Sequence, residues 1–245
     1  MNVVGIVCAL ASEARHLDPA LRRHAALASL ADGTLLVVSG IGAAAARSGA
    51  HALMAAGAGA LATFGLAGGL DPELAAGAIV LPNEVVALDG TAVATAGAWR
   101  ERVAAGITAR APAARGRLLS SGGAIGSIAD KAALHRATGA VAVDMESLAV
   151  AQAAAARQLP FIAVRVIVDT AADAVPWAAM AAADGAGHVR LGRLIAALLR
   201  APAELAPLIR LARCYRAASR SLALVARSGC LGHGAFAAGV DARVA

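Results

Sequence analysis

Residues 140–169 read AVAVDMESLAVAQAAAARQLPFIAVRVIVD, and their pattern indicates the fold class. Two apolar runs that contain β-branched residues, Ala140 to Val143 and Phe161 to Val168, predict strands. Between them, the alanine-rich residues Glu146 to Arg157 are numerous enough to form a helix that crosses from one strand to the next. A strand, a helix and a second strand in this order are the unit of an α/β sheet.

The same alternation continues along the chain in both directions. Further strands are predicted at Val3 to Val7, Leu35 to Val38, Ala60 to Phe64 and Ile79 to Leu88, and further helices at Gly42 to Ala56, Trp99 to Ala109 and Asp130 to Thr138. The expected class is α/β, with helices on the faces of a mostly parallel or mixed sheet.

The composition excludes several classes of protein. Of the 245 residues 59% are apolar and 16% are charged, so the chain buries enough apolar surface to fold. The 23 uncharged residues from Ser48 to Leu70 include six glycines and eight alanines, which argues against a membrane span. Three cysteines lie too far apart for a disulfide framework or a zinc site: Cys8, Cys214 and Cys230. We therefore expect a cytoplasmic protein without a metal.

The basic residues are concentrated at the C-terminal end. Residues 188–245 hold nine arginines against two acidic residues, whereas the preceding 187 residues hold 13 basic and 14 acidic groups. Pro202 and Pro207 mark the junction between the two parts. The sequence therefore predicts a body over residues 1–200 and a basic helical extension over residues 201–245.

Within this extension, residues 204–227 predict an amphipathic helix. At 100° per residue, most apolar side chains lie on one side and five arginines on the other. A surface helix that packs its apolar side on the body explains this pattern. A helix that touches an anionic membrane or an apolar substrate, through residues 203–227, explains it as well. Nucleic acid is not an expected partner, because no aromatic residues alternate with the charges.

Charged side chains follow three of the predicted strands. Glu13 comes after the first strand, Asp144 and Glu146 after the strand that begins at Ala140, and Arg165 and Asp169 close the last. In open α/β sheets, ligands bind beyond the carboxyl ends of the strands. These residues are therefore candidates for one acidic cleft, although Asp144 and Glu146 could simply cap the helix that follows them.

Two glycine-containing segments also follow strands. Ser39-Gly40-Ile41-Gly42 predicts a tight turn that brings backbone NH groups near a ligand or water. The acidic residue that a dinucleotide site needs about 20 positions later is missing, so no such cofactor is expected. The cluster from Gly65 to Gly69 predicts a turn at the end of a strand, where a ligand can lie against the backbone.

Taken in order, these segments resemble the purine nucleoside phosphorylase and methylthioadenosine nucleosidase superfamily over roughly residues 3–195. The segments are Gly5 to Leu10 with Glu13, Ser39 to Gly42, Gly65 to Leu70, Gly77 to Pro82, Asp144 to Ser147, and Arg165 to Asp169. Glu13-Ala14-Arg15 and the C-terminal extension are similar to the hopanoid-associated branch, the adenosylhopane nucleosidases or phosphorylases. The resemblance implies a three-layer α/β/α sandwich with a mixed, barrel-like sheet. Residues 1–200 would then be a catalytic domain that cleaves an N-glycosidic bond.

The resemblance also implies roles for individual residues. Asp169 matches the general acid that protonates N7 of the purine, and Glu146 matches the ligand of the ribose 2′-hydroxyl. Met145 would lie under the sugar, Glu13 would polarise the attacking water, and Arg165 would hold this cluster. The remaining substrate-binding candidates are Ser39, Gly42, Gly68, Ala124 and Ile125, and Trp177 matches a mobile cap.

The expected co-substrate is water or inorganic phosphate, with no organic cofactor and no metal. Thr63 and Leu66 stand where bacterial phosphorylases have an arginine and a serine for phosphate, which favours hydrolysis. In the hopanoid branch the substrate would be adenosine with a triterpenoid on its 5′ carbon. The alternatives are a methylthioadenosine or adenosylhomocysteine nucleosidase, a phosphate-dependent phosphorylase, and a nucleoside-binding protein without activity. The resemblance further implies a homodimer. A lipid-linked substrate would imply that the protein lies peripherally at the inner membrane.

Overall fold

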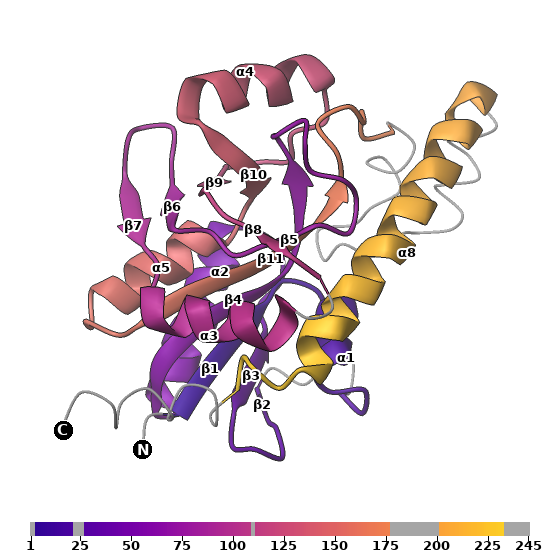
Figure 1. The fold of residues 1–245 in the computed structure, drawn as a ribbon. Coiled ribbons are helices and arrows are strands. Elements are labelled where there is room, and N and C mark those ends of the chain that lie inside the picture. Colours follow the sequence, from indigo (N-terminus) through magenta and orange to yellow (C-terminus); the bar gives the residue numbers. More distant parts are fainter. Residues whose placement is uncertain (1–2, 22–26, 109–110, 177–200, 233–245) are drawn as a thin grey trace.

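A twelve-residue strand, β4 (Ala58–Gly69), lies at the centre of the fold (Figure 1). The computed structural model describes residues 3–21, 27–108, 111–176 and 201–232. Strand β4 pairs in parallel with β1 (Val3–Cys8) and with β11 (Phe161–Asp169). Its last residues, Gly68 and Gly69, pair antiparallel with β10 (Ala140–Asp144). The central strand thus has three neighbours, and the sheet branches there.

Seven shorter strands complete the sheet. They are β2 (Ala28–Ser29), β3 (Leu35–Val38), β5 (Ile79–Val80), β6 (Glu84–Val86), β7 (Ala92–Ala94), β8 (Ala113–Ala114) and β9 (Arg117–Ser120). The main path runs β2-β3-β1-β4-β10-β9-β6-β7, while β11 joins β4 to β5, and β5 pairs with β8. The pairing is parallel in some pairs and antiparallel in others, so the sheet is mixed.

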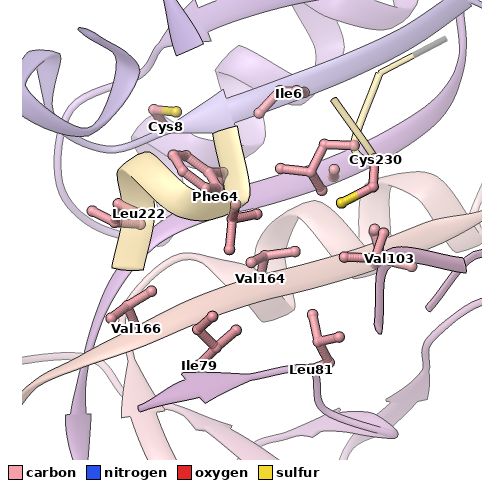
Figure 2. Packing of buried hydrophobic residues seen from close by; sticks show 14 of the residues in the cluster. Ile6, Cys8, Phe64, Ile79, Leu81, Val103, Val164, Val166, Leu222 and Cys230 are labelled. Carbon is pink, nitrogen blue, oxygen red and sulfur yellow. The ribbon is translucent and has the colours of Figure 1, made fainter. Parts of the chain in front are cut away.

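Helices cover both faces of the sheet (Figure 1). They are α1 (Ala11–Leu17), α2 (Ala43–Ala55), α3 (Gly97–Thr108), α4 (Ile128–Thr138), α5 (Ser147–Ala155), the short 3-10 helix η1 (Pro202–Glu204) and α8 (Leu205–Arg227). Alternate side chains of β1 point to opposite faces. Ile6 belongs to the core under α1, α3 and α8, shown in Figure 2, and Val7 to the core under α2 and α5. The predicted three-layer sandwich is therefore confirmed.

Two sequence predictions need correction in this sheet. The single strand expected from Ile79 to Leu88 is two strands, β5 and β6. Pro82 between them has no NH for a ladder, and Asn83 N bonds to Gly116 O instead, so the chain changes neighbours. The turn expected at Gly65 is also absent, because β4 continues through it to Gly69 with partners along both edges.

Helix α8 packs its C-terminal half on the body. Ala218, Leu222 and Val225 are buried in the core, and Leu222 lies beside Phe64 and Cys8 in Figure 2. The N-terminal half instead exposes large apolar side chains at Leu205, Ile209 and Tyr215. Among the described residues, none of the helices has a stretch long and apolar enough to cross a bilayer. The division of the chain at residue 200 stays a prediction.

Candidate active site

The three predicted acids gather around one pocket. Asp169 ends β11, Glu146 precedes α5, and Glu13 lies in the first turn of α1, directly after β1. Each is almost fully buried, with exposed fractions of 7%, 7% and 3%. The pocket has a volume of about 200 Å³ and is lined by Glu146 and Asp169, while Glu13 lies behind Leu66, whose NH it binds. The structure therefore places two of the three predicted acids on the pocket wall and the third, Glu13, bonded to the backbone of a wall residue.

Most of the predicted substrate-binding residues line this pocket as well. Gly68, Ala124, Ile125 and Met145 are among its walls. Ser39 is not among the described lining residues, and its hydroxyl donates to the carbonyl of the next residue at 2.8 Å. The predicted lid residue, Trp177, lies outside the described residues.

Arg165 occupies the centre of the buried charges. Its Nη2 lies 2.6 Å from Asp144 Oδ2 and 3.9 Å from Glu146 Oε2, and it donates to the Ser147 hydroxyl at 3.0 Å. Burial alone would lower the pKa of Arg165, but Asp144, Glu146 and Glu13 together raise it above its ordinary value. The guanidinium therefore stays charged and pairs with the carboxylates around it.

Glu13 is fixed by the backbone at both carboxylate oxygens. Its Oε2 accepts a hydrogen bond from Leu10 N and its Oε1 accepts one from Leu66 N, each at 2.9 Å. Burial raises the pKa of Glu13 above its usual range, although Arg165 and the two NH donors oppose the rise. A carboxylate with a raised pKa is a stronger base than an exposed glutamate, and each oxygen keeps a lone pair for a water.

Glu146 is held by the turn that precedes α2. Gly42 adopts a φ of 97°, which favours glycine, and its NH donates to Glu146 Oε1 at 2.8 Å. The sequence predicted that this turn presents a backbone NH to a ligand or water. The structure shows that the NH binds a protein carboxylate instead, and so orients it. Burial raises the pKa of Glu146, while Arg165 lowers it.

The site also contains polar residues that were not among the predicted catalytic or substrate-binding residues. Asp144 accepts from Ser147 N at 3.0 Å, as the helix-capping alternative predicted for this residue, and it pairs with Arg165 too. Thr63 is fully buried and shares a hydrogen bond of 2.8 Å with the Ser147 hydroxyl. Lys131 forms an ion pair with Asp169. Lys131 is the single lysine of the chain, and this is the one feature of the sequence that sets it apart.

Position 65 needs a glycine, because the side chains of Arg165 and Glu13 lie against its backbone. A Cβ at this position would lie 2.6 Å from both Arg165 Nη1 and Glu13 Oε1. We expect Gly65→Ala to lower the free energy of unfolding by about 1–3 kcal/mol and to lower activity, because the buried charges must shift. Gly97→Ala is the matched control, since its Cβ would meet only the end of Arg100 at 3.8 Å. Equal thermal denaturation midpoints for the two variants would contradict this view of the packing.

Comparison with known proteins assigns the fold to a class. It is the fold of nucleosidases, a class of enzymes that cleave N-glycosidic bonds. More particularly, the chain belongs to the phosphorylase superfamily, whose profile matches residues 7–200. The family resemblance seen in the sequence is thereby confirmed. No curated protein sequence matches the chain.

Solved structures of nucleosidases share the fold. A 5′-methylthioadenosine/S-adenosylhomocysteine nucleosidase from Colwellia psychrerythraea, in complex with adenine, is 25% identical with a TM-score of 0.61, over 69% of this chain and 83% of that one. A Helicobacter pylori nucleosidase variant with 5′-methylthioadenosine in the active site is 16% identical with a TM-score of 0.65, over 99% of both chains. Futalosine hydrolase from the same organism is 16% identical with a TM-score of 0.59, over 68% of this chain and 89% of that one.

Proposed function

We propose that the protein hydrolyses the bond between adenine and the ribose of a 5′-substituted adenosine, and that the substrate is adenosylhopane. The observation that carries the proposal is the pocket in which Asp169 and Glu146 meet, with Glu13 directly behind its wall. Nucleosidases with adenine or 5′-methylthioadenosine bound share this fold. Their ligands support adenine as the leaving base.

Asp169 is the acid in this mechanism. Its carboxyl group donates a proton to N7 of the purine, and the base then leaves as a neutral molecule. Burial raises the pKa of Asp169, while Lys131 opposes the rise. A raised pKa keeps the proton on the carboxyl group at higher pH than in an exposed aspartate, as a general acid requires.

Glu146 stabilises the positive charge that develops on the ribose as the glycosidic bond breaks. A carboxylate that is already oriented by Gly42 N and Met145 N needs little reorganisation when this charge appears. The same oxygens can accept a hydrogen bond from the 2′-hydroxyl. Met145 lines the pocket and supplies apolar contact to the sugar.

Glu13 and a water complete the reaction. The carboxylate accepts a proton from the water as the oxygen attacks the anomeric carbon, so that one proton enters at Glu13 and one leaves from Asp169. Arg165 lies near both Glu13 and Glu146, and its positive charge favours the ionised form of Glu13 that the base role requires. The products are adenine and a 5′-substituted ribose.

Water suits this pocket better than phosphate does. Among the described lining residues, three are acidic and none is basic. Thr63, where phosphorylases have an arginine, is buried and bonded to Ser147, and Leu66 carries no hydroxyl. A phosphate dianion needs charge-assisted donors and would be repelled by these carboxylates. Adenine release at an equal rate with and without phosphate is the expected result, and strict dependence on phosphate would favour the phosphorylase alternative.

The pH dependence of kcat/KM tests the acid and base roles. We expect a bell-shaped profile. Activity falls as the pH drops through the raised pKa of Glu13, because the base becomes protonated, and falls again as the pH rises through the raised pKa of Asp169. Glu13→Gln should lower kcat by about 10²–10⁴-fold and change the acidic limb, which then reports Glu146 without Glu13. Wild-type kcat in this variant would exclude Glu13 as the base.

The exposed side of α8 supports contact with a membrane surface that carries a lipid-linked substrate. Opposite the buried Leu222, the helix exposes Ile209 together with Arg213, Arg216 and Arg220. Apolar and basic side chains on one exposed face are typical of interfacial helices. We propose a peripheral position at the cytoplasmic side of the inner membrane.

Vesicle binding tests this contact without disturbing the core. The triple variant Arg213→Ser, Arg216→Ser, Arg220→Ser should lose binding to vesicles with anionic lipid, whereas Arg47→Ser, Arg136→Ser, Arg157→Ser, on other helices or their ends, should retain it. Both variants should cleave a soluble nucleoside equally. Binding that is equal for the two variants would rule out α8 as the contact.

The 5′ substituent distinguishes the remaining alternatives. A methylthioadenosine or adenosylhomocysteine nucleosidase would prefer small 5′ thioethers, whereas the proposed enzyme should cleave an adenosine with a long 5′ alkyl chain at least as fast. A nucleoside-binding protein would cleave neither. The same proposal includes water as the co-substrate, no cofactor, and a homodimer. Light scattering of the purified protein tests the dimer.

A further inference from the structure

Lys131 is completely buried, which is unusual for a lysine. It lies in the first turns of α4, and its ammonium donates to three oxygens at the end of β11. They are Asp169 Oδ2, the carbonyl of Thr170 at 2.8 Å and the carbonyl of Asp173 at 2.8 Å. An ammonium group has three N–H donors, so this set of acceptors uses all of them.

The three contacts hold the segment that carries Asp169. Within this segment the Asp173 carboxylate accepts from Thr170 N at 3.0 Å and from its hydroxyl at 2.7 Å. Arg210 of α8 pairs with the same carboxylate at 2.5 Å from the outside. Lys131 thus fixes residues 169–173 from the interior, whereas the Arg210 side chain is largely exposed.

Several other charged groups face this pair. Asp144 and Glu146 line the pocket next to Asp169, and the backbone carbonyl of Asp173 accepts from the ammonium. Cys214 and Arg210 of α8 line the neighbouring cavity of about 370 Å³ that also reaches Asp169. Among these described groups, Lys131 is the only cation that contacts the Asp169 carboxylate directly.

We propose that Lys131 is a positioning residue for the catalytic acid: it orients the Asp169 carboxyl group toward the pocket and makes it a stronger proton donor. This inference rests on the proposed function. When Asp169 transfers its proton to purine N7, the carboxylate that remains is already paired with an ammonium. Asp169 regains a proton from solvent after the base has left.

Activity measurements on substituted enzymes test the role in the reaction. Lys131→Met should lower kcat about 10-fold or more with a much smaller change in KM, and should move the alkaline limb of the pH profile upward by about one pH unit or more. Lys131→Arg keeps the charge and should keep the limb near its wild-type position. Arg136→Met removes an exposed cation from the same helix and should change neither. A folded Lys131→Met enzyme whose limb does not move would overturn the proposal.

A measurement without substrate separates this inference from the proposed function. Lysine labelled with ¹³C at Cε gives a single side-chain NMR signal, because the chain has one lysine. In the wild type this signal should shift with pH as Asp169 takes up a proton. The shift should disappear in Asp169→Asn and persist in Asp130→Asn, which changes a neighbouring acid on α4. A titration that is the same in all three proteins would overturn the pairing.

The two experiments fail in different ways. If the wild type releases no base but its lysine signal reports the protonation of Asp169, the proposed function is wrong and the ion pair stands. If the enzyme is active and the lysine signal ignores Asp169, the function stands and the role of Lys131 is wrong. The NMR comparison needs only the wild type and aspartate variants, so it remains decisive if Lys131→Met does not fold.

Discussion

Asp169→Asn is expected to lower kcat by about 10²–10⁴-fold, because the amide cannot donate a carboxylic acid proton to the departing base. The amide keeps an oxygen that accepts from Lys131, so the backbone from 169 to 173 should stay in place. KM should change much less than kcat, because the proton is transferred during the chemical step and not when the substrate binds. Single-turnover measurement of base release separates this chemical step from product release.

Asp89→Asn is the matched control, because Asp89 lies in an exposed turn and accepts from Thr91 N. It makes the same chemical change away from the pocket. The control should retain wild-type kcat, and circular dichroism should show that both variants are folded. If Asp169→Asn retained wild-type kcat, the assignment of the general acid would be wrong.

Arg165→Met should have the largest effect on stability. The variant leaves Asp144, Glu146 and Glu13 buried without their shared cation, which costs about 3–5 kcal/mol. Typical domains have about 5–15 kcal/mol of total stability, so this is a large fraction. Urea denaturation at neutral pH measures it. Activity should be lost as well, because the same three carboxylates repel one another and leave their positions.

The loss caused by Arg165→Met should shrink at acidic pH. Arg165 lowers the pKa values of Glu13 and Glu146, and its removal raises them further above their values in the unfolded chain. A folded-state pKa above the unfolded one adds stability as the pH falls through it. The difference from wild type should therefore be smaller at about pH 5 than at pH 8. A difference that grows on acidification would contradict this account of the cluster.

Strands with continuous β-branched residues were predictable from the sequence. Leu35–Val38 forms with the expected bounds, and the unit of residues 140–169 forms as a strand, helix and strand. The extension of β4 through Gly65 was not predictable, because glycine has low strand propensity. Its strand conformation comes from β11 and β10 alongside it. Short strands such as Ala113–Ala114 have no local signal and depend on the same kind of pairing.

The candidate site was predictable where acids follow strands. Asp169 and Glu146 reach one pocket because the ends of β11 and β10 both meet β4 at its glycines. Lys131 was not predictable as a partner of Asp169, since α4 has no strand-end pattern and its contact depends on how the helix packs. The hydrogen bond from Gly42 N to Glu146 was not predictable either, because it joins residues 104 positions apart in the sequence.

Mass spectrometry of the products distinguishes hydrolysis of adenosylhopane from the alternatives. The purified protein would be incubated with adenosylhopane in ¹⁸O-labelled water that contains inorganic phosphate. Hydrolysis by Glu13 and Asp169 predicts adenine and ribosylhopane, with one ¹⁸O on the anomeric carbon. Phosphoribosylhopane as the product would contradict hydrolysis. An intact substrate, under conditions in which methylthioadenosine is cleaved, would contradict the proposed 5′ substituent.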